Sequence, residues 1–165
     1  MQFLTAKTIL YVRIVWLLYI TYSLAFDPKS LSTIGFVILL GQAMDVKFVI
    51  LEDTNPMLGI TSLLFALLTL TDLIPILSEN LPYFESMIPI RTIIFFIIGA
   101  YSYLAKQSIL SNNLIFTYSF FEIWLNFLIY NNLRDEKYYR LKKFVEDNQE
   151  RIQEFEGDRV VVIED

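Results

Sequence analysis

The chain has 165 residues, of which 55% are hydrophobic and 19% are charged, and its formal net charge is −5. Soluble domains are about 45–50% apolar, so this composition and a mean hydropathy of +0.50 favour a membrane protein. The chain has no cysteine and no histidine, which excludes disulfides, thiolate metal sites and histidine-based triads. Its acidic balance argues against binding to nucleic acid.

Apolar residues gather in five runs, and each approaches the ~20 residues that a helix needs to cross the hydrocarbon layer. The first run ends at the Asp27-Pro28 step, because a residue before proline is pushed out of helical geometry. The runs cover residues 4–26, 31–51, 58–78, 88–110 and 114–130. We therefore predict an all-α, polytopic membrane helical bundle with four to five transmembrane helices.

The second run is the weakest candidate for a span, since Asp45 and Lys47 interrupt its second half. Only residues 31–44 are free of charge, and ~14 residues suit a re-entrant or interfacial segment as well as a span. Ser30 or Ser32 is the predicted N-cap of its helix. With five spans the N-terminus lies opposite the C-terminus, and with four spans both termini lie on one side.

Prolines mark the third and fourth runs. Pro75 cannot donate to the carbonyl of Thr71, which predicts a kink or hinge there. Pro82 and Pro89 predict a loop over residues 79–89, so the fourth run is expected to start near residue 88 with Arg91 close to the interface. A tight turn at residues 111–113 predicts that the fourth and fifth helices are antiparallel neighbours.

The chain divides into a transmembrane bundle over residues 1–133 and a charged tail over residues 134–165. The tail begins with five basic residues, Arg134, Lys137, Arg140, Lys142 and Lys143. The positive-inside rule predicts a cytosolic tail. Apolar residues recur between these charges at helical spacing, which predicts an amphipathic helix that binds the membrane surface or a partner.

Ionisable residues inside the apolar runs are expensive and therefore candidates for function. Arg13 lies about 12 Å along its run and Glu122 about 13 Å along its own, which favours an Arg13–Glu122 pair. In the four-span model Asp72 also lies at the same membrane depth as Arg13. In the five-span model Asp45 lies at the depth of Arg13, and Asp72 is left without a partner. The predicted intramembrane polar cluster comprises Arg13, Gln42, Asp45, Asp72, Glu122 and Asn126. It either locks the bundle or lines a cavity for an ion, a proton or a lipid headgroup.

Three short motifs resemble the fungal "increased loss of mitochondrial DNA" family. They are Gly41-Gln42-Ala43-Met44, Thr71-Asp72-Leu73-Ile74-Pro75, and Pro89-Ile90-Arg91 leading into residues 93–104. The resemblance covers roughly residues 5–135. It implies a multi-pass protein of the endoplasmic reticulum whose loss harms maintenance of the mitochondrial genome, with no established enzymatic activity and no cofactor.

The sequence contains no Gly-rich phosphate loop and no metal-ligand cluster, so we expect neither an enzyme nor a bound cofactor or metal. The expected function is a membrane scaffold or adaptor of the endoplasmic reticulum that supports a partner in lipid supply. Its expected partners are the lipid bilayer and another membrane or lipid-handling protein. The alternative is a small ion or lipid transporter or channel that uses Asp72 and Glu122.

Overall fold

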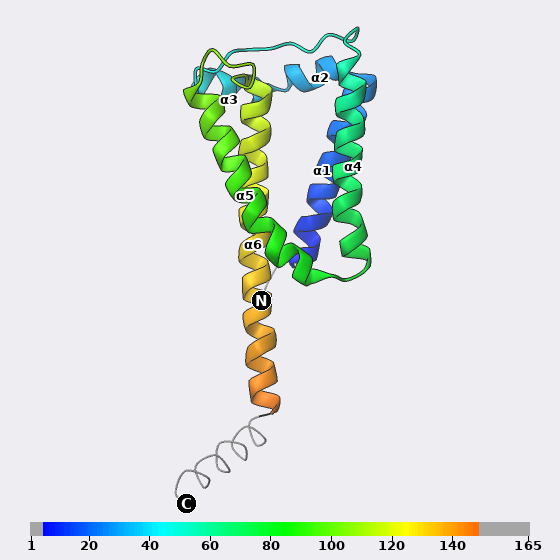
Figure 1. Cartoon of the computed structure of the whole chain (residues 1–165), viewed down its shortest axis with the longest axis vertical. Coiled ribbons are helices and arrows are strands. Elements are labelled where there is room, and N and C mark those ends of the chain that lie inside the picture. Colours follow the sequence, from blue (N-terminus) through cyan, green and yellow to red (C-terminus); the bar gives the residue numbers. More distant parts are fainter. Residues whose placement is uncertain (1–4, 149–165) are drawn as a thin grey trace, which may run out of the picture.

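The computed structural model describes residues 5–148, and its regular secondary structure in that range is entirely helical. This confirms the predicted all-α fold class. The four long helices are α1 (Ala6–Phe26), α4 (Met57–Leu77), α5 (Leu81–Leu104) and α6 (Asn113–Asp147). The two short helices, α2 (Pro28–Thr33) and α3 (Gly35–Ala43), lie at one end of the long ones (Figure 1).

Asp27 both ends α1 and begins α2. Its backbone N–H donates to the carbonyl of Ser23, and its side chain accepts from the N–H of Ser30. Pro28 follows in the first turn of α2, where its missing N–H costs nothing. The predicted caps Ser30 and Ser32 are therefore wrong. Ser32 is buried, and its hydroxyl accepts a 2.9 Å hydrogen bond from the N–H of Leu51.

The second apolar run does not form a spanning helix. It forms α2, with 6 residues, and α3, with 9 residues, which rise only about 9 and 14 Å. Residues 46–50 that follow are not helical and bind the start of α6: Asn113 donates to the carbonyl of Lys47 at 2.9 Å, and its side chain accepts from Val49 at 3.0 Å. This run therefore packs across the bundle end, and a fifth span is not confirmed.

Helix α5 starts seven residues before the predicted fourth run. Asn80 caps it by accepting from the N–H of Tyr83, and Pro82 stands in its first turn. Pro89 lies inside the helix. Transmembrane helices tolerate such a proline where neighbouring groups satisfy the backbone carbonyl that loses its hydrogen bond. The predicted loop over residues 79–89 is therefore wrong beyond residue 80, and Arg91 lies well inside α5 rather than near its end.

The long helices pack as two antiparallel pairs, α1 with α4 and α5 with α6 (Figure 1). This confirms the predicted antiparallel pairing of the last two helices. The α1–α4 pair is joined by a hydrogen bond from the hydroxyl of Ser62 to the carbonyl of Thr21 at 2.9 Å. The α5–α6 pair meets at small residues, where a Cβ on Gly99 would lie 3.5 Å from that of Ser119. Small residues allow such close approach in membranes.

Within the described residues, α1, α4 and α5 are long and apolar enough to cross a membrane. Their outer surfaces carry large apolar side chains, including Leu63, Leu67, Leu70, Ile93, Phe96 and Ile97. An apolar surface of this extent marks contact with lipid or protein. Pro75 lies in the last turn of α4, which ends at Leu77, so a bend there would redirect only the short connection to α5.

Helix α6 extends well beyond the other helices at the end where α1 begins (Figure 1). It runs without interruption across residue 134, so the predicted division between bundle and tail falls inside one helix. The predicted tail helix is present as far as Asp147. The part of the predicted tail over residues 149–165 lies outside the described residues.

Candidate functional site

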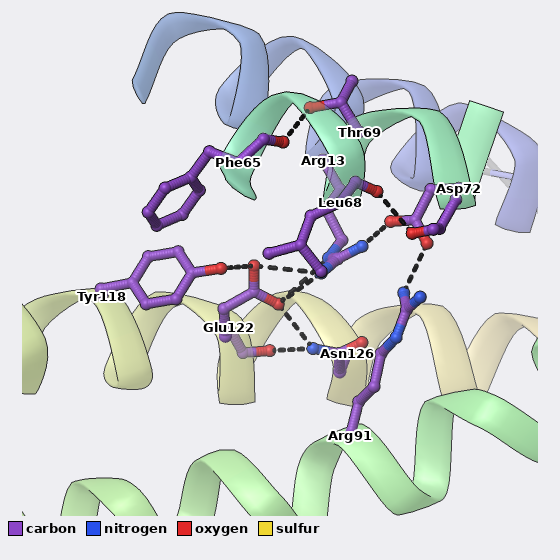
Figure 2. Close-up of polar contacts among 10 residues, drawn as sticks. Arg13, Phe65, Leu68, Thr69, Asp72, Arg91, Tyr118, Glu122 and Asn126 are labelled. Carbon is purple, nitrogen blue, oxygen red and sulfur yellow. Dashed lines mark hydrogen bonds and ion pairs between the residues drawn. The ribbon is translucent and has the colours of Figure 1, made fainter. Parts of the chain in front are cut away.

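Arg13 of α1 and Glu122 of α6 form a two-point ion pair. Arg13 Nε lies 3.0 Å from Glu122 Oε2, and Nη2 lies 3.2 Å from Oε1. Figure 2 shows the guanidinium lying against the carboxylate from the neighbouring helix. A planar guanidinium matches a carboxylate in this way, which strengthens and orients the contact. The predicted Arg13–Glu122 pair is present.

Asp72 of α4 joins the same group from the other side. Its Oδ2 contacts Nη1 of Arg13, and its Oδ1 lies 2.6 Å from Nη1 of Arg91 on α5. Asp72 thus lies between two arginines, as Figure 2 shows. We call Arg13, Asp72, Arg91 and Glu122 the charge cluster. It joins all four long helices at one place.

Two further residues of α6 complete the hydrogen bonding of Glu122. The Tyr118 hydroxyl lies 3.0 Å from Glu122 Oε1, and Asn126 Nδ2 donates to Oε2 at 2.9 Å. Tyr118 and Asn126 stand four residues before and after Glu122, which places all three on one helix face. The carboxylate oxygens are therefore well satisfied by neutral and charged donors.

The charge cluster is shielded from the surroundings and formally neutral. Glu122 and Asp72 are 0% exposed and Arg13 is 2% exposed, while the Arg91 side chain retains 13% exposure. Two positive and two negative charges sum to zero. Because isolated buried charges are very costly, mutual neutralisation is what permits these four groups inside the bundle.

Gln42 and Asp45 are not part of this group. Gln42 is exposed on α3, and Asp45 follows it at a φ of 51°, in the turn that ends the helix. Asp45 forms an exposed ion pair with Lys106, just past the end of α5. A hydrogen bond from Lys106 and its positive charge lower the pKa of the Asp45 carboxyl. Their predicted place in the cluster is therefore wrong, since Asp45 comes level with Arg13 only in the five-span alternative, in which the second run crosses.

Sequence reasoning missed Arg91 of the charge cluster and Tyr118, which contacts Glu122. Arg91 was placed at the interface because the fourth helix was counted from residue 88. The available signal was Asn80 followed by Pro82, an N-cap residue with proline in the first turn. Counted from there, Arg91 lies about 15 Å into α5, level with a membrane interior.

The basic residues of the tail lie on the exposed part of α6. Lys137 Nζ is 2.7 Å from Glu85 at the start of α5, and Arg140 lies 3.6 Å from the same carboxylate. Arg134 and Lys142 pair with carboxylates of α6 itself, and Lys143 is exposed. Two of the five predicted binding residues therefore also attach the tail to the bundle.

No group of three or more metal-binding side chains occurs among residues 5–148. The fold and the charge cluster define a multi-pass, all-helical membrane protein whose helices are joined internally by ion pairs. Residues 4–143 match the family described as "Increased loss of mitochondrial DNA protein 1", and the chain belongs to this family.

Two fungal relatives are similar to most of the chain. Protein ILM1 of Saccharomyces cerevisiae is 38% identical over 153 residues, covering 90% of this chain and 75% of the relative. Protein ilm1 of Schizosaccharomyces pombe is 32% identical over 124 residues, covering 73% of this chain and 77% of the relative. No solved structure matches the chain. The family resemblance predicted from the three motifs is confirmed.

Proposed function

We propose that the chain is a non-enzymatic scaffold or adaptor of the endoplasmic reticulum membrane. It supports a partner in lipid supply and, through that partner, the maintenance of mitochondrial DNA to which the family's name refers. The observation that carries the proposal is the closed charge cluster. Each buried carboxylate contacts an arginine, so the cluster holds the helices together and leaves neither Asp72 nor Glu122 free for chemistry.

A transporter or channel that uses Asp72 and Glu122 is the alternative function. Charges that serve transport face a water-filled path or exchange partners during the cycle. Here both carboxylates are buried and oriented toward arginines from other helices (Figure 2). This arrangement supports the scaffold over the transporter.

The orientation proposed for the scaffold has four crossings with both termini in the cytosol. The first part of α6 is the fourth crossing, because its one charged residue, Glu122, is enclosed and neutralised. The loops at the α2–α3 end then face the lumen. The basic segment of α6 lies on the cytosolic side, as the positive-inside rule requires.

Single cysteines in this naturally cysteine-free chain test the orientation. In sealed microsomes, Thr5→Cys should react with a membrane-impermeant maleimide at once, whereas Thr54→Cys should react only after permeabilisation. The physical reason is that one helix, α1, separates the two positions, and the second run does not cross. Labelling of both positions from the same side would contradict the four-crossing arrangement.

The proposed partner contact is the exposed apolar face of the tail helix. Tyr138, Leu141 and Val145 are exposed and follow one another at spacings of three and four, which places them on one face. Lys137 and Arg140 meanwhile attach this helix to α5. The tail is thus held at a fixed position with an apolar face free for a second protein.

Replacing both Leu141 and Val145 by aspartate should reduce recovery of the partner at least ~10-fold, since two charges would be forced into an apolar contact. The measurement is quantitative mass spectrometry of proteins that co-purify with the tagged chain from solubilised membranes. Tyr139→Asp is the matched control, because Tyr139 is equally exposed but lies off this face. Deletion of residues 134–165 should have the same effect, and full retention of the partner would contradict the tail's role.

A further inference from the structure

A large apolar cavity separates the two helix pairs at the α2–α3 end. Its volume is about 660 Å³, and its walls come from α1, α4 and α6, with α2, α3 and the following segment closing one end. Figure 1 shows α1 and α4 standing apart from α5 and α6 at this level. The volume lies within the ~300–1,000 Å³ typical of small-molecule sites.

The cavity runs from the end of α1 toward the charge cluster. Along α1 its walls extend from Leu24 to Trp16, a length of about 12 Å. Tyr118 lines the inner end, and its hydroxyl contacts Glu122 of the cluster. A molecule that fills the cavity therefore extends from the α2–α3 end into the bundle without reaching the ion pairs.

The surroundings and the shape of the cavity identify the class of occupant. Its walls belong to a bundle whose outer surfaces are apolar, so hydrocarbon chains surround the bundle in a bilayer. Water is disfavoured against walls that are almost entirely apolar. A helix of a second copy is too wide, since 12 Å of a helix about 10–12 Å in diameter needs roughly 900 Å³ or more.

Trp16 and Thr117 line the cavity, but their polar atoms Nε1 and Oγ1 are enclosed by protein. A ligand in the cavity therefore contacts the apolar parts of these two side chains. An unbranched hydrocarbon chain provides the apolar body that such walls require.

We propose that this cavity binds an acyl chain of a glycerolipid, because its walls are apolar and belong to a bundle that hydrocarbon surrounds in a bilayer. The site requires the bundle and not the tail. Loss of lipid binding and loss of the partner are therefore separable results, and the site is independent of the adaptor role.

The chain's two tryptophans provide the assay, because Trp16 lines the cavity and Trp124 is 54% exposed on α6. Each is studied alone, in Trp124→Phe and Trp16→Phe variants reconstituted with phosphatidylcholine brominated on its acyl chains. Quenching of Trp16 should saturate at a mole fraction of brominated lipid at least ~3-fold lower than quenching of Trp124. Quenching of Trp124 should rise in proportion to the brominated fraction of the bulk lipid. Equal profiles, or no quenching of Trp16, would overturn the proposal.

A cavity-filling substitution provides the second arm. Thr61→Phe, in the Trp124→Phe background, places a ring in the wall of the cavity and should remove the saturable quenching of Trp16. Leu63→Phe is the matched control, on the exposed face of α4, and should leave it unchanged. Saturable quenching that survives Thr61→Phe would overturn the site. Stronger quenching by a brominated free fatty acid than by the phospholipid would overturn the assignment to a glycerolipid.

Discussion

Replacing Arg13 by methionine should destabilise the bundle by about 3–5 kcal/mol, the cost of leaving buried charges without their partner. Arg13 contacts both Asp72 and Glu122 from a site that is 2% exposed. Its removal leaves Glu122 with only neutral hydrogen-bond donors and the cluster with a net negative charge. The measurement is the unfolding equilibrium of the purified protein in a fixed detergent, followed by tryptophan fluorescence.

Two comparisons make this result specific to the buried pair. Arg134→Met is the matched control, since Arg134 is exposed and lies 3.7 Å from its neighbour Asp135, and it should change stability by no more than ~0.5 kcal/mol. Adding Glu122→Gln to Arg13→Met should recover part of the loss, because the remaining Asp72–Arg91 pair is neutral. Equal effects of Arg13→Met and Arg134→Met would contradict a structural role for the cluster.

Asp72→Asn should cost about 2–3 kcal/mol, less than the about 3–5 kcal/mol of breaking a fully buried ion pair, because only the partly exposed Arg91 loses its carboxylate. The substitution leaves Arg91 without its carboxylate, while Arg13 keeps Glu122. Arg91 retains some exposure and a long side chain that can extend toward a polar boundary, which limits the loss. The same unfolding measurement applies.

The Asp72 variant also separates the scaffold from the transporter. If Asp72 has a structural role, Asp72→Asn lowers the stability of the bundle. Adding Arg91→Gln to Asp72→Asn should then restore part of this stability, because the cluster becomes neutral again. Asp53→Asn is the control, because its pair with Lys29 is exposed and such pairs contribute about 0–1 kcal/mol. If Asp72→Asn instead leaves stability unchanged and abolishes ion flux into liposomes, the transporter is correct and the scaffold is not.

Helix boundaries were predictable where local chemistry decides them. Asp27-Pro28 separates α1 from α2 as expected, because proline restricts the residue before it. The start of α5 was not predicted, since Pro82 and Pro89 were both treated as breaking the helix. Proline is harmless in a first turn, and inside a membrane helix neighbouring helices compensate for it.

Part of the site was predictable from depth alone. Arg13 and Glu122 lie at similar distances along their runs, and an arginine inside a membrane needs a carboxylate. Their depths along the runs were therefore enough to predict the pair. The place of Asp72 depended on whether the second run crosses. Since α2 and α3 are too short to do so, Asp72 comes level with Arg13 and contacts it.

The sequence by itself determined that this chain is an all-helical membrane protein of its family, because hydropathy and short motifs are properties of neighbouring residues. It also determined that charges inside the apolar runs must find partners. Only the tertiary structure decided which partners, joining Arg13, Asp72, Arg91 and Glu122 from four helices and leaving Asp45 at the surface. The physical reason is that such contacts depend on how helices far apart in sequence pack, which no local pattern encodes.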